Sequence, residues 1–305
     1  MVKVKAWISA ARPRTLPLSV SGIITGSAMA YGTGDFQWKV FLLALLTTLG
    51  FQILSNFAND YGDGMKGTDN EERVGPIRAM QSGLLSEKEL KRGIILTVII
   101  TLLIALILIY TAFGSGNFLV SVVFLILGLA SIYAAVKYTV GKHAYGYRGL
   151  GDIFVFVFFG LLAVAGSFFL YTHRLNVLIF LPAIAIGLWS TAVLNLNNMR
   201  DRIPDTRANK NTLAVLLGEK RIKNYHILIV LSGFIAVLTY FTLADQWTWA
   251  GISCLVFIPL SKHLVTVLKN KNAALLDPEL KKVALSTFLF SILFALGFVL
   301  KDYIQ

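Results

Sequence analysis

The chain has 305 residues, of which 56% are hydrophobic and only 14% are charged, and its formal net charge is +12. A typical soluble domain has about 25% charged residues, and a soluble fold could not bury this much apolar surface. The composition therefore excludes a soluble globular domain and predicts a polytopic membrane protein.

Apolar runs of about 20 residues, the length that crosses a bilayer core, recur along the whole chain. They predict nine transmembrane helices in a single domain, residues 1–305, with no second soluble unit. The runs are 15–34, 39–58, 92–112, 117–136, 152–171, 176–198, 225–243, 247–268 and 283–301.

Basic residues alternate between the two sides of these runs. All of the 28 Lys and Arg residues except Lys39, Arg174 and Lys301 lie before the first run, in the loops after even-numbered runs, or in the ends of the runs that border these loops. Since positive loops face the cytoplasm, we expect the N-terminus inside, the C-terminus outside, and a cytoplasmic (inner) membrane location. The positive charge is then a topology signal with some attraction to membrane lipid. We expect no nucleic-acid binding, because the charge is divided among short loops.

Two acidic segments share one spacing, Asn-x-x-x-Asp, and each directly follows an apolar run. The first contains Asn59, Asp60 and Asp63, and the second contains Asn197, Asp201 and Asp205. Positions four apart lie on one face of a helix. The segments are four predicted spans apart, which indicates two related halves around one central cavity with an active site at its cytoplasmic mouth.

Asp and Asn offer oxygen as the ligand atom for a hard cation, and no Cys-x-x-Cys or His-x-x-x-His pattern accompanies them. These features favour Mg²⁺ over Zn²⁺, and Mg²⁺ commonly binds carboxylates together with substrate phosphate oxygens. The bland alternative is that the acids cap helices or balance loop arginines. The candidate metal ligands are Asn59, Asp60, Asp63, Asp69, Asn197, Asp201 and Asp205.

Basic and aromatic residues near the acidic segments suit a phosphorylated substrate. Arg73, Arg78 and Lys210 follow the acidic segments and could bind diphosphate oxygens. A third segment, 138–152, alternates tyrosines and glycines with charged residues, and an interfacial tyrosine belt explains it equally well. Its candidates are Lys142, Tyr147, Arg148 and Asp152, and Arg14 near the N-terminus is a further candidate for an anionic substrate.

These motifs resemble a known family. The segment 56–63 is similar to the first Asp-rich motif of the UbiA superfamily of intramembrane prenyltransferases, and 197–205 is similar to the second. The segments 12–17, 52–55, 145–152 and 195–201 resemble the branch that prenylates 1,4-dihydroxy-2-naphthoate in menaquinone biosynthesis. One position departs from the superfamily pattern: Gly67 stands where an Asp often follows, so Asp60 or Asp69 would complete the first metal site.

The resemblance implies transfer of a polyprenyl chain from polyprenyl diphosphate to 1,4-dihydroxy-2-naphthoate, giving demethylmenaquinol, diphosphate and CO₂. It implies two Mg²⁺ ions on the acidic motifs as cofactors. Tyr147 would stabilise an allylic cation, and Asp152 would orient a ring hydroxyl. Lys142, Arg148 or Arg14 would hold the acceptor carboxylate. The alternatives are another aromatic acceptor (4-hydroxybenzoate or homogentisate) and a cation-coupled transporter.

Overall fold

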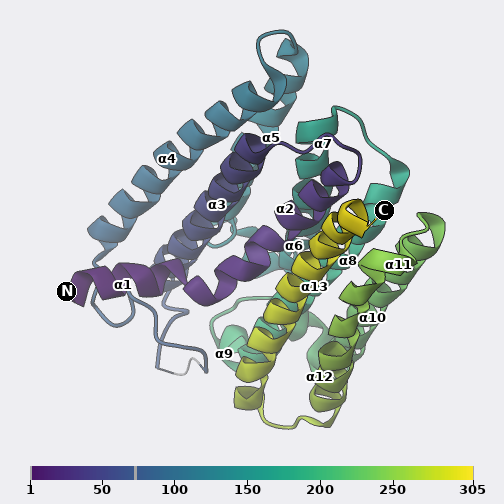
Figure 1. Cartoon of the computed structure of the whole chain (residues 1–305). Coiled ribbons are helices and arrows are strands. Elements are labelled where there is room, and N and C mark those ends of the chain that lie inside the picture. Colours follow the sequence, from purple (N-terminus) through teal and green to yellow (C-terminus); the bar gives the residue numbers. More distant parts are fainter. Residues whose placement is uncertain (1, 72–73, 305) are drawn as a thin grey trace.

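The computed structural model describes residues 2–71 and 74–304, and all regular structure within these ranges is helical. The helices form a bundle (Figure 1). Eight segments of the described chain are long and apolar enough to cross a membrane, which confirms the predicted all-α membrane bundle. They are α3 (Trp38–Met65), α4 (Glu87–Phe113), α5 (Phe118–Lys137), α6–η3–α7 (Gly151–Thr172), η4–α8 (Val177–Arg200), α10 (Leu213–Leu243), α11–η5–α12 (Trp247–Lys269) and η6–α13 (Ala273–Asp302).

Several of these segments are composite. Their parts are α6 (Gly151–Val155), the π-helix η3 (Phe156–Gly166), α7 (Ser167–Thr172), η4 (Val177–Ile179), α8 (Phe180–Arg200), α11 (Trp247–Ala250), η5 (Gly251–Val256), α12 (Phe257–Lys269), η6 (Ala273–Leu275) and α13 (Leu276–Ile304). The remaining helices are α1 (Val2–Ala11), η1 (Pro13–Thr15), α2 (Leu16–Tyr31), η2 (Tyr145–Arg148) and α9 (Arg202–Arg207).

The count of eight and the nine predicted spans differ only in α2. This helix has 16 residues, so it is about 24 Å long at 1.5 Å per residue, shorter than a hydrocarbon core of about 30 Å. Eleven of its 16 residues are buried. It packs between α13 and η3 inside the bundle, where a short helix need not span the bilayer by itself.

Glycines allow α2 to approach η3 closely. A Cβ atom on Gly26 would lie 2.3 Å from the Val164 carbonyl oxygen and 2.1 Å from Ser167 Oγ. We therefore expect Gly26→Ala to lower the free energy of unfolding by about 1–3 kcal/mol through overpacking, measured by reversible denaturation in detergent. Gly128→Ala in α5 is the control, because its Cβ would meet no atom within 4 Å. That change should be neutral or stabilising, and an equal loss in both variants would contradict the packing explanation.

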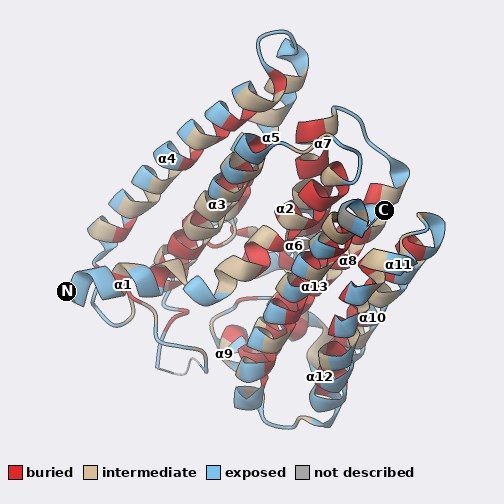
Figure 2. Ribbon diagram, viewed as in Figure 1, coloured by how far each residue is buried: buried red, intermediate tan, exposed pale blue. Residues whose placement is uncertain are grey.

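Burial is concentrated in the C-terminal half of the bundle. Of the apolar stretch of α8, 56% is buried, against 17% for α5. Figure 2 shows buried residues along α2, α8 and α13, while α4 is largely exposed. Trp189 of α8 is fully buried and packs edge-on against Phe234, Phe257 and Phe290.

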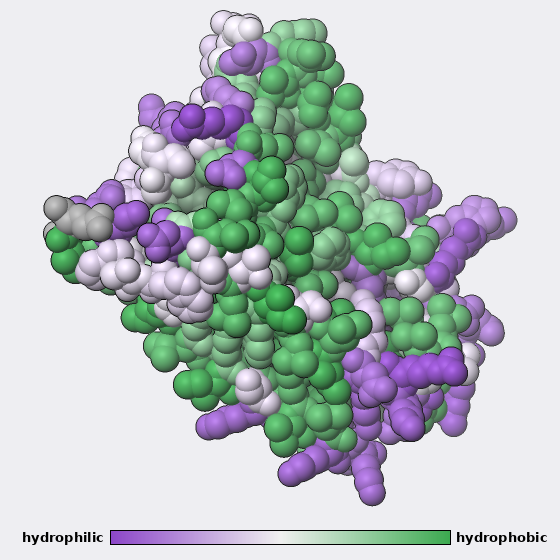
Figure 3. Space-filling view, turned by 90° about the vertical axis from the view of Figure 1, so that its right-hand side faces the viewer, coloured by the Kyte–Doolittle hydropathy of each residue, from purple (hydrophilic) through white to green (hydrophobic). Residues whose placement is uncertain are grey.

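The outer surface is apolar across its middle. Figure 3 shows hydrophobic residues over most of the central surface and hydrophilic residues towards its margins. Exposed Leu, Ile and Val side chains on α4, α5 and α10 make up much of this surface, as expected for helices that face lipid. Figure 1 places α1, α9 and the loop after α3 at the same end of the bundle. This end carries both acidic motifs.

Candidate active site

The acidic motifs lie at the ends of two long helices. Asn59 and Asp63 are in the last two turns of α3, and Asn197 is in the last turn of α8. The second motif does not occupy one continuous helix as its spacing predicted, since the helix breaks at Asp201 and Asp205 belongs to α9. The Asp201 and Asp205 amides still donate to the carbonyl oxygens four residues earlier, at 3.0 and 2.8 Å. The backbone hydrogen bonds therefore keep their four-residue spacing across the break in the helix.

Lys210 joins the two motifs. Its ammonium nitrogen lies 3.3 Å from Asp63 Oδ2 and 4.0 Å from Asp205 Oδ1. Burial acts to lower the pKa of Lys210, but the carboxylates of Asp63 and Asp205 outweigh it, and the net pKa is raised. Lys210 is therefore a buried cation between carboxylates from the two motifs, which confirms that the two segments meet.

Tyr147 supports the first motif from the third segment. Its hydroxyl donates to Asp63 Oδ1 at 2.7 Å and lies 2.6 Å from Thr68 Oγ1. Burial and the nearby Asp63 carboxylate raise the pKa of Tyr147, so the phenol stays protonated and can donate. The ammonium of Lys66 lies 3.8 Å from the centre of the Tyr147 ring, a cation–π distance. Burial lowers the pKa of Lys66.

Arg200 supports the second motif, although it is not among the site residues predicted from the sequence. Its side chain is almost fully buried, donates to both Asp201 oxygens at 3.0 and 2.7 Å, and donates to Asn197 Oδ1 at 2.7 Å. Its third contact is Asp277 at the start of α13, which also pairs with Arg14 at 3.5 Å. The spacing of Asn197 and Arg200, three apart on a helix, is the one signal that could have found this pair.

A cavity of about 370 Å³ connects the motifs with the bundle interior. Its polar end contains both acidic motifs, whereas its far end is apolar. The polar lining includes Arg12, Asn59, Asp63, Arg78, Asn197, Asp201, Asp205 and Lys210, and the apolar lining includes Phe124, Phe154, Phe158, Phe159, Leu162 and Leu170. The π-helix η3 supplies three of the apolar residues; π-helical turns are frequent at functional sites.

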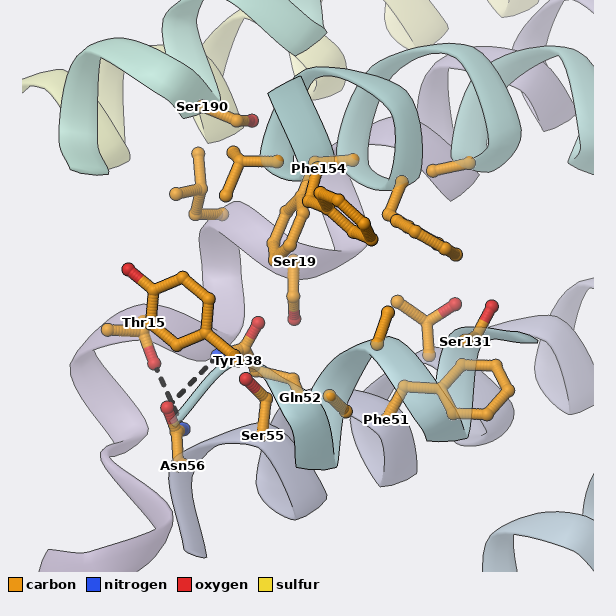
Figure 4. A pocket seen from close by; sticks show the side chains of 18 of the residues that line it. Thr15, Ser19, Phe51, Gln52, Ser55, Asn56, Ser131, Tyr138, Phe154 and Ser190 are labelled. Atoms are coloured by element: carbon orange, nitrogen blue, oxygen red, sulfur yellow. Dashed lines mark hydrogen bonds between the residues drawn. The ribbon is translucent and has the colours of Figure 1, made fainter. Parts of the chain in front are cut away.

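Figure 4 shows how the polar part of the lining passes into the apolar part. Thr15, Gln52 and Asn56 form a hydrogen-bonded group on one side, while Phe51 and Phe154 border the cavity beyond them. The Asn56 amide accepts from Gln52 at 3.1 Å and donates to the Ala11 carbonyl at 2.8 Å. Asn56 therefore ties the N-terminal segment to α3 at the cavity wall.

Two predicted metal ligands lie outside this cavity. Asp60 is buried on another side of α3, where its Oδ2 accepts from the Ala79 amide at 3.2 Å. Asp69 is buried near Arg78, with 3.9 Å between Asp69 Oδ2 and Arg78 Nε. Asp60 lines a second cavity of about 280 Å³, which it shares with Arg12, Arg14 and Arg78. The first motif thus presents Asn59 and Asp63 to the main cavity, and neither Asp60 nor Asp69.

Other predicted residues also lie away from the main cavity. Asp152 is buried against Tyr225 of α10 and does not line the cavity, although Phe154 and Val155 do. Lys142 and Arg148 are exposed, and Arg148 contacts His143. Arg73 lies outside the described residues.

The N-terminal contact to the main cavity is Arg12 and not Arg14. Arg12 lines both cavities, whereas Arg14 lines only the second. The backbone of Arg12 is left-handed, with φ of 53°, directly before Pro13. Tyr138 and Tyr145 also line the main cavity, whereas Tyr147 is the tyrosine predicted from this segment.

The family model described as the UbiA prenyltransferase family matches residues 19–292. The chain belongs to the UbiA prenyltransferase family. It is an integral membrane prenyltransferase, as the resemblance of its motifs implied. Family membership also argues against the cation-coupled transporter.

Curated relatives match nearly the whole chain. A 1,4-dihydroxy-2-naphthoate octaprenyltransferase of Haemophilus influenzae is 45% identical over 303 residues, which cover 98% of this chain and 97% of the relative. The protein of that name from Escherichia coli K12 is 43% identical, covering 99% of this chain and 97% of the relative.

Solved structures of other proteins share the fold. A UbiA homolog from Archaeoglobus fulgidus, bound to DMAPP and Mg²⁺, superposes with a TM-score of 0.62 at 15% identity, over 95% of this chain and 99% of that chain. A digeranylgeranylglyceryl phosphate synthase superposes with a TM-score of 0.59 at 18% identity, over 98% of both chains.

Proposed function

We propose that this prenyltransferase transfers a polyprenyl chain from polyprenyl diphosphate to 1,4-dihydroxy-2-naphthoate in menaquinone biosynthesis. The two curated relatives that carry this activity in their names cover almost the whole chain at 43–45% identity. The structural observation that carries the proposal is the polarity of the main cavity, which has carboxylates, amides and cations at one end and phenylalanines at the other. A diphosphate with an apolar tail has the same polarity.

The residues at the polar end fit Mg²⁺. Asn59 and Asp63 from one motif and Asn197, Asp201 and Asp205 from the other all line the cavity and offer oxygen ligands. The Lys210 ammonium already balances Asp63 and Asp205 from a position between them, where a metal cation would serve the same carboxylates. We propose two Mg²⁺ ions, one for each motif. When bound, they would neutralise the charge of the departing diphosphate.

The other residues that line the cavity would bind different parts of the prenyl diphosphate. Arg78 and Lys210 would hold diphosphate oxygens, and the phenylalanine wall would hold the prenyl tail and keep water from the allylic cation. The C–O bond of the prenyl diphosphate breaks, and its electron pair leaves with diphosphate. A ring carbon of the naphthoate then bonds to the cation, and loss of the carboxylate as CO₂ returns an electron pair to the ring.

The acceptor carboxylate needs a cation at the polar end of the cavity. We propose Arg12 for this role, because Lys142 and Arg148 are exposed and Arg14 lies in the second cavity. Tyr147 would act through its hydrogen bond to Asp63. Tyr138 and Tyr145 would present aromatic surface to the cavity. The positive loops favour a cytoplasmic position for this end of the bundle, with the N-terminus inside.

Tyr147→Phe removes the hydroxyl that donates to Asp63 and leaves the ring. A hydrogen bond to a charged group contributes about 1.5–3 kcal/mol, so we expect kcat/KM for prenyl diphosphate to fall about tenfold or more. Tyr133→Phe is the control, since Tyr133 is exposed on the lipid side of α5. Steady-state kinetics of both variants in nanodiscs would check this, and equal rates for the two variants would contradict a role for the hydroxyl.

The proposed acceptor is tested with the purified full-length chain in nanodiscs. Radiolabelled prenyl diphosphate is supplied with 1,4-dihydroxy-2-naphthoate, 4-hydroxybenzoate or homogentisate, each with and without Mg²⁺. We expect Mg²⁺-dependent lipid product with the naphthoate, and at most traces with the other acceptors. Preferred labelling of 4-hydroxybenzoate or homogentisate would overturn the proposed acceptor and retain the prenyltransferase.

A further inference from the structure

A chain of buried polar side chains crosses four helices behind the active site. Asn195 Oδ1 lies 3.1 Å from His226 Nδ1, His226 Nε2 lies 2.8 Å from His263 Nε2, and His263 Nδ1 lies 2.6 Å from Glu279 Oε2. These residues belong to α8, α10, α12 and α13 in that order. Asn195 and both histidines are fully buried, and Glu279 is 5% exposed. None of the four lines the main cavity.

Burying such groups is costly unless every one of them is hydrogen-bonded. The neighbouring buried positions of the same helices, such as Ile229 and Leu260, are apolar, so packing alone does not require polar residues here. The four hydrogen-bonded residues must therefore provide something that apolar side chains would not. Their hydrogen bonds have a direction, which follows from counting donors.

Glu279 determines which atom donates in each of these hydrogen bonds. This carboxylate pairs with Lys282 and can only accept, so His263 donates to it through Nδ1. A neutral His263 then accepts at Nε2, and His226 must donate through its own Nε2. The remaining ring nitrogen, His226 Nδ1, becomes an acceptor, and its neighbour Asn195 must donate.

Asn195 can meet this requirement by one rotation of its amide. With Oδ1 facing His226, the buried Asn195 Nδ2 has no hydrogen-bond partner within the described ranges. A half-turn of the amide exchanges two atoms of nearly equal size and gives Nδ2 the His226 acceptor. The chain then consists of three donated bonds directed from Asn195 to Glu279, and it selects one orientation of the Asn195 amide.

The ends of this chain adjoin the second acidic motif. Asn195 lies two residues before Asn197, which accepts from the Arg200 guanidinium that also holds Asp201. At the other end, the first turn of α13 contains Glu279 and also Asp277, the other carboxylate on Arg200. The first turn of α13 is therefore connected to the end of α8 by two sets of polar contacts, one through Arg200 and one through His263 and His226.

We propose that Glu279, His263 and His226 are positioning residues. They act through Asn195 to fix the end of α8, so that Asn197 and Asp201 are held ready to bind a divalent cation. The proposal rests on the proposed function, in which the second motif holds a metal ion. None of the three residues lines the main cavity, and their effect is on the geometry of the metal ligands.

The test measures Mn²⁺ binding to the full-length chain in nanodiscs by the electron paramagnetic resonance signal of the free ion. Residues that orient metal ligands typically contribute 10–100-fold in affinity. We expect His263→Phe and Asn195→Leu each to raise the Mn²⁺ Kd about tenfold. Both substitutions interrupt the same series of hydrogen bonds. The double variant should therefore also show a loss of about tenfold in Mn²⁺ affinity, and not the product of the two losses.

Substitutions at Glu279 provide a second pair that does not alter the buried histidines. Glu279→Gln keeps a hydrogen-bonding group and should bind Mn²⁺ within about twofold of the unmodified chain, whereas Glu279→Leu should lose about tenfold. If His263→Phe does not fold, the Mn²⁺ Kd values of these two Glu279 variants test the proposal instead. Leu260→Ala in α12 is the control for packing: it should lower the Tm without changing the Mn²⁺ Kd.

Three results would overturn the proposal: single variants that bind Mn²⁺ as tightly as the unmodified chain, a double variant whose loss is the product of the single losses, or a Leu260→Ala variant with the same loss of affinity. Failure of the proposed function is recognised separately. An unmodified chain that binds no Mn²⁺ contradicts both proposals. Prenyl transfer with unchanged Mn²⁺ affinity in every variant contradicts this inference alone.

Discussion

Asp63→Asn is expected to lower kcat/KM for prenyl diphosphate about 10³-fold, the loss seen when a strong electrostatic contact in an active site is removed. Asp63 is the carboxylate of the first motif that lines the main cavity, and it contacts both Lys210 and Tyr147. Removing its charge would weaken the metal site and remove one of the two carboxylates that pair with Lys210. Steady-state kinetics with Mg²⁺ titrated at each substrate concentration would measure the loss.

Asp60→Asn is the matched control for Asp63→Asn. It makes the same change one turn earlier in α3, but Asp60 faces the Ala79 amide and the second cavity. We expect a loss of about tenfold or less, consistent with an indirect contribution. Equal losses at the two positions would show that Asp60 also acts in the metal site, as the sequence analysis predicted.

Arg200→Leu is expected to lower the free energy of unfolding by about 3–5 kcal/mol, because it removes the guanidinium that donates to both oxygens of a buried carboxylate. Arg200 is 2% exposed and Asp201 is 6% exposed, and the two form a bidentate pair. The substitution also releases Asn197 and Asp277. Reversible denaturation in detergent would measure the loss, and Arg200→Lys should recover only part of it, since an ammonium cannot reproduce the planar fork.

Arg202→Leu is the control for Arg200→Leu. Arg202 pairs at 3.7 Å with Glu219, whose side chain is 60% exposed, and exposed pairs contribute about 0–1 kcal/mol. A similar loss in the two variants would mean that the buried ion cluster does not hold the end of α8.

The helical period located the two motifs but did not orient every residue in them. Asn59 and Asp63 are four apart and share the face that lines the cavity. Asp60 is rotated by about 100° from Asn59 around the helix, which is why it faces Ala79. Asp60 and Asp63 are three apart, only about 60° from each other by the same count, so the period alone does not separate them. The break at Asp201 depends on the cap geometry, which the period does not contain.

Residues that depend on contacts between distant segments could not be found in this way. Arg12 and Arg14 are both basic and only two positions apart, but only Arg12 lines the main cavity, and its backbone is left-handed. The histidine chain joins four helices whose polar residues have no common spacing. Hydropathy predicted the membrane segments well, because length and composition alone define them, but it did not show that α2 is short and buried.

In the proposed reaction, a prenyl group replaces the carboxylate of a naphthoate in the cavity between the two motifs. The most direct measurement uses 1,4-dihydroxy-2-naphthoate labelled with ¹⁴C in its carboxyl group and an unlabelled prenyl diphosphate, with the purified chain and Mg²⁺. We predict that ¹⁴CO₂, diphosphate and prenylated quinol form in equal amounts, and that Asp63→Asn lowers the rates of all three together. Label retained in the lipid product, or diphosphate released without CO₂, would contradict the account.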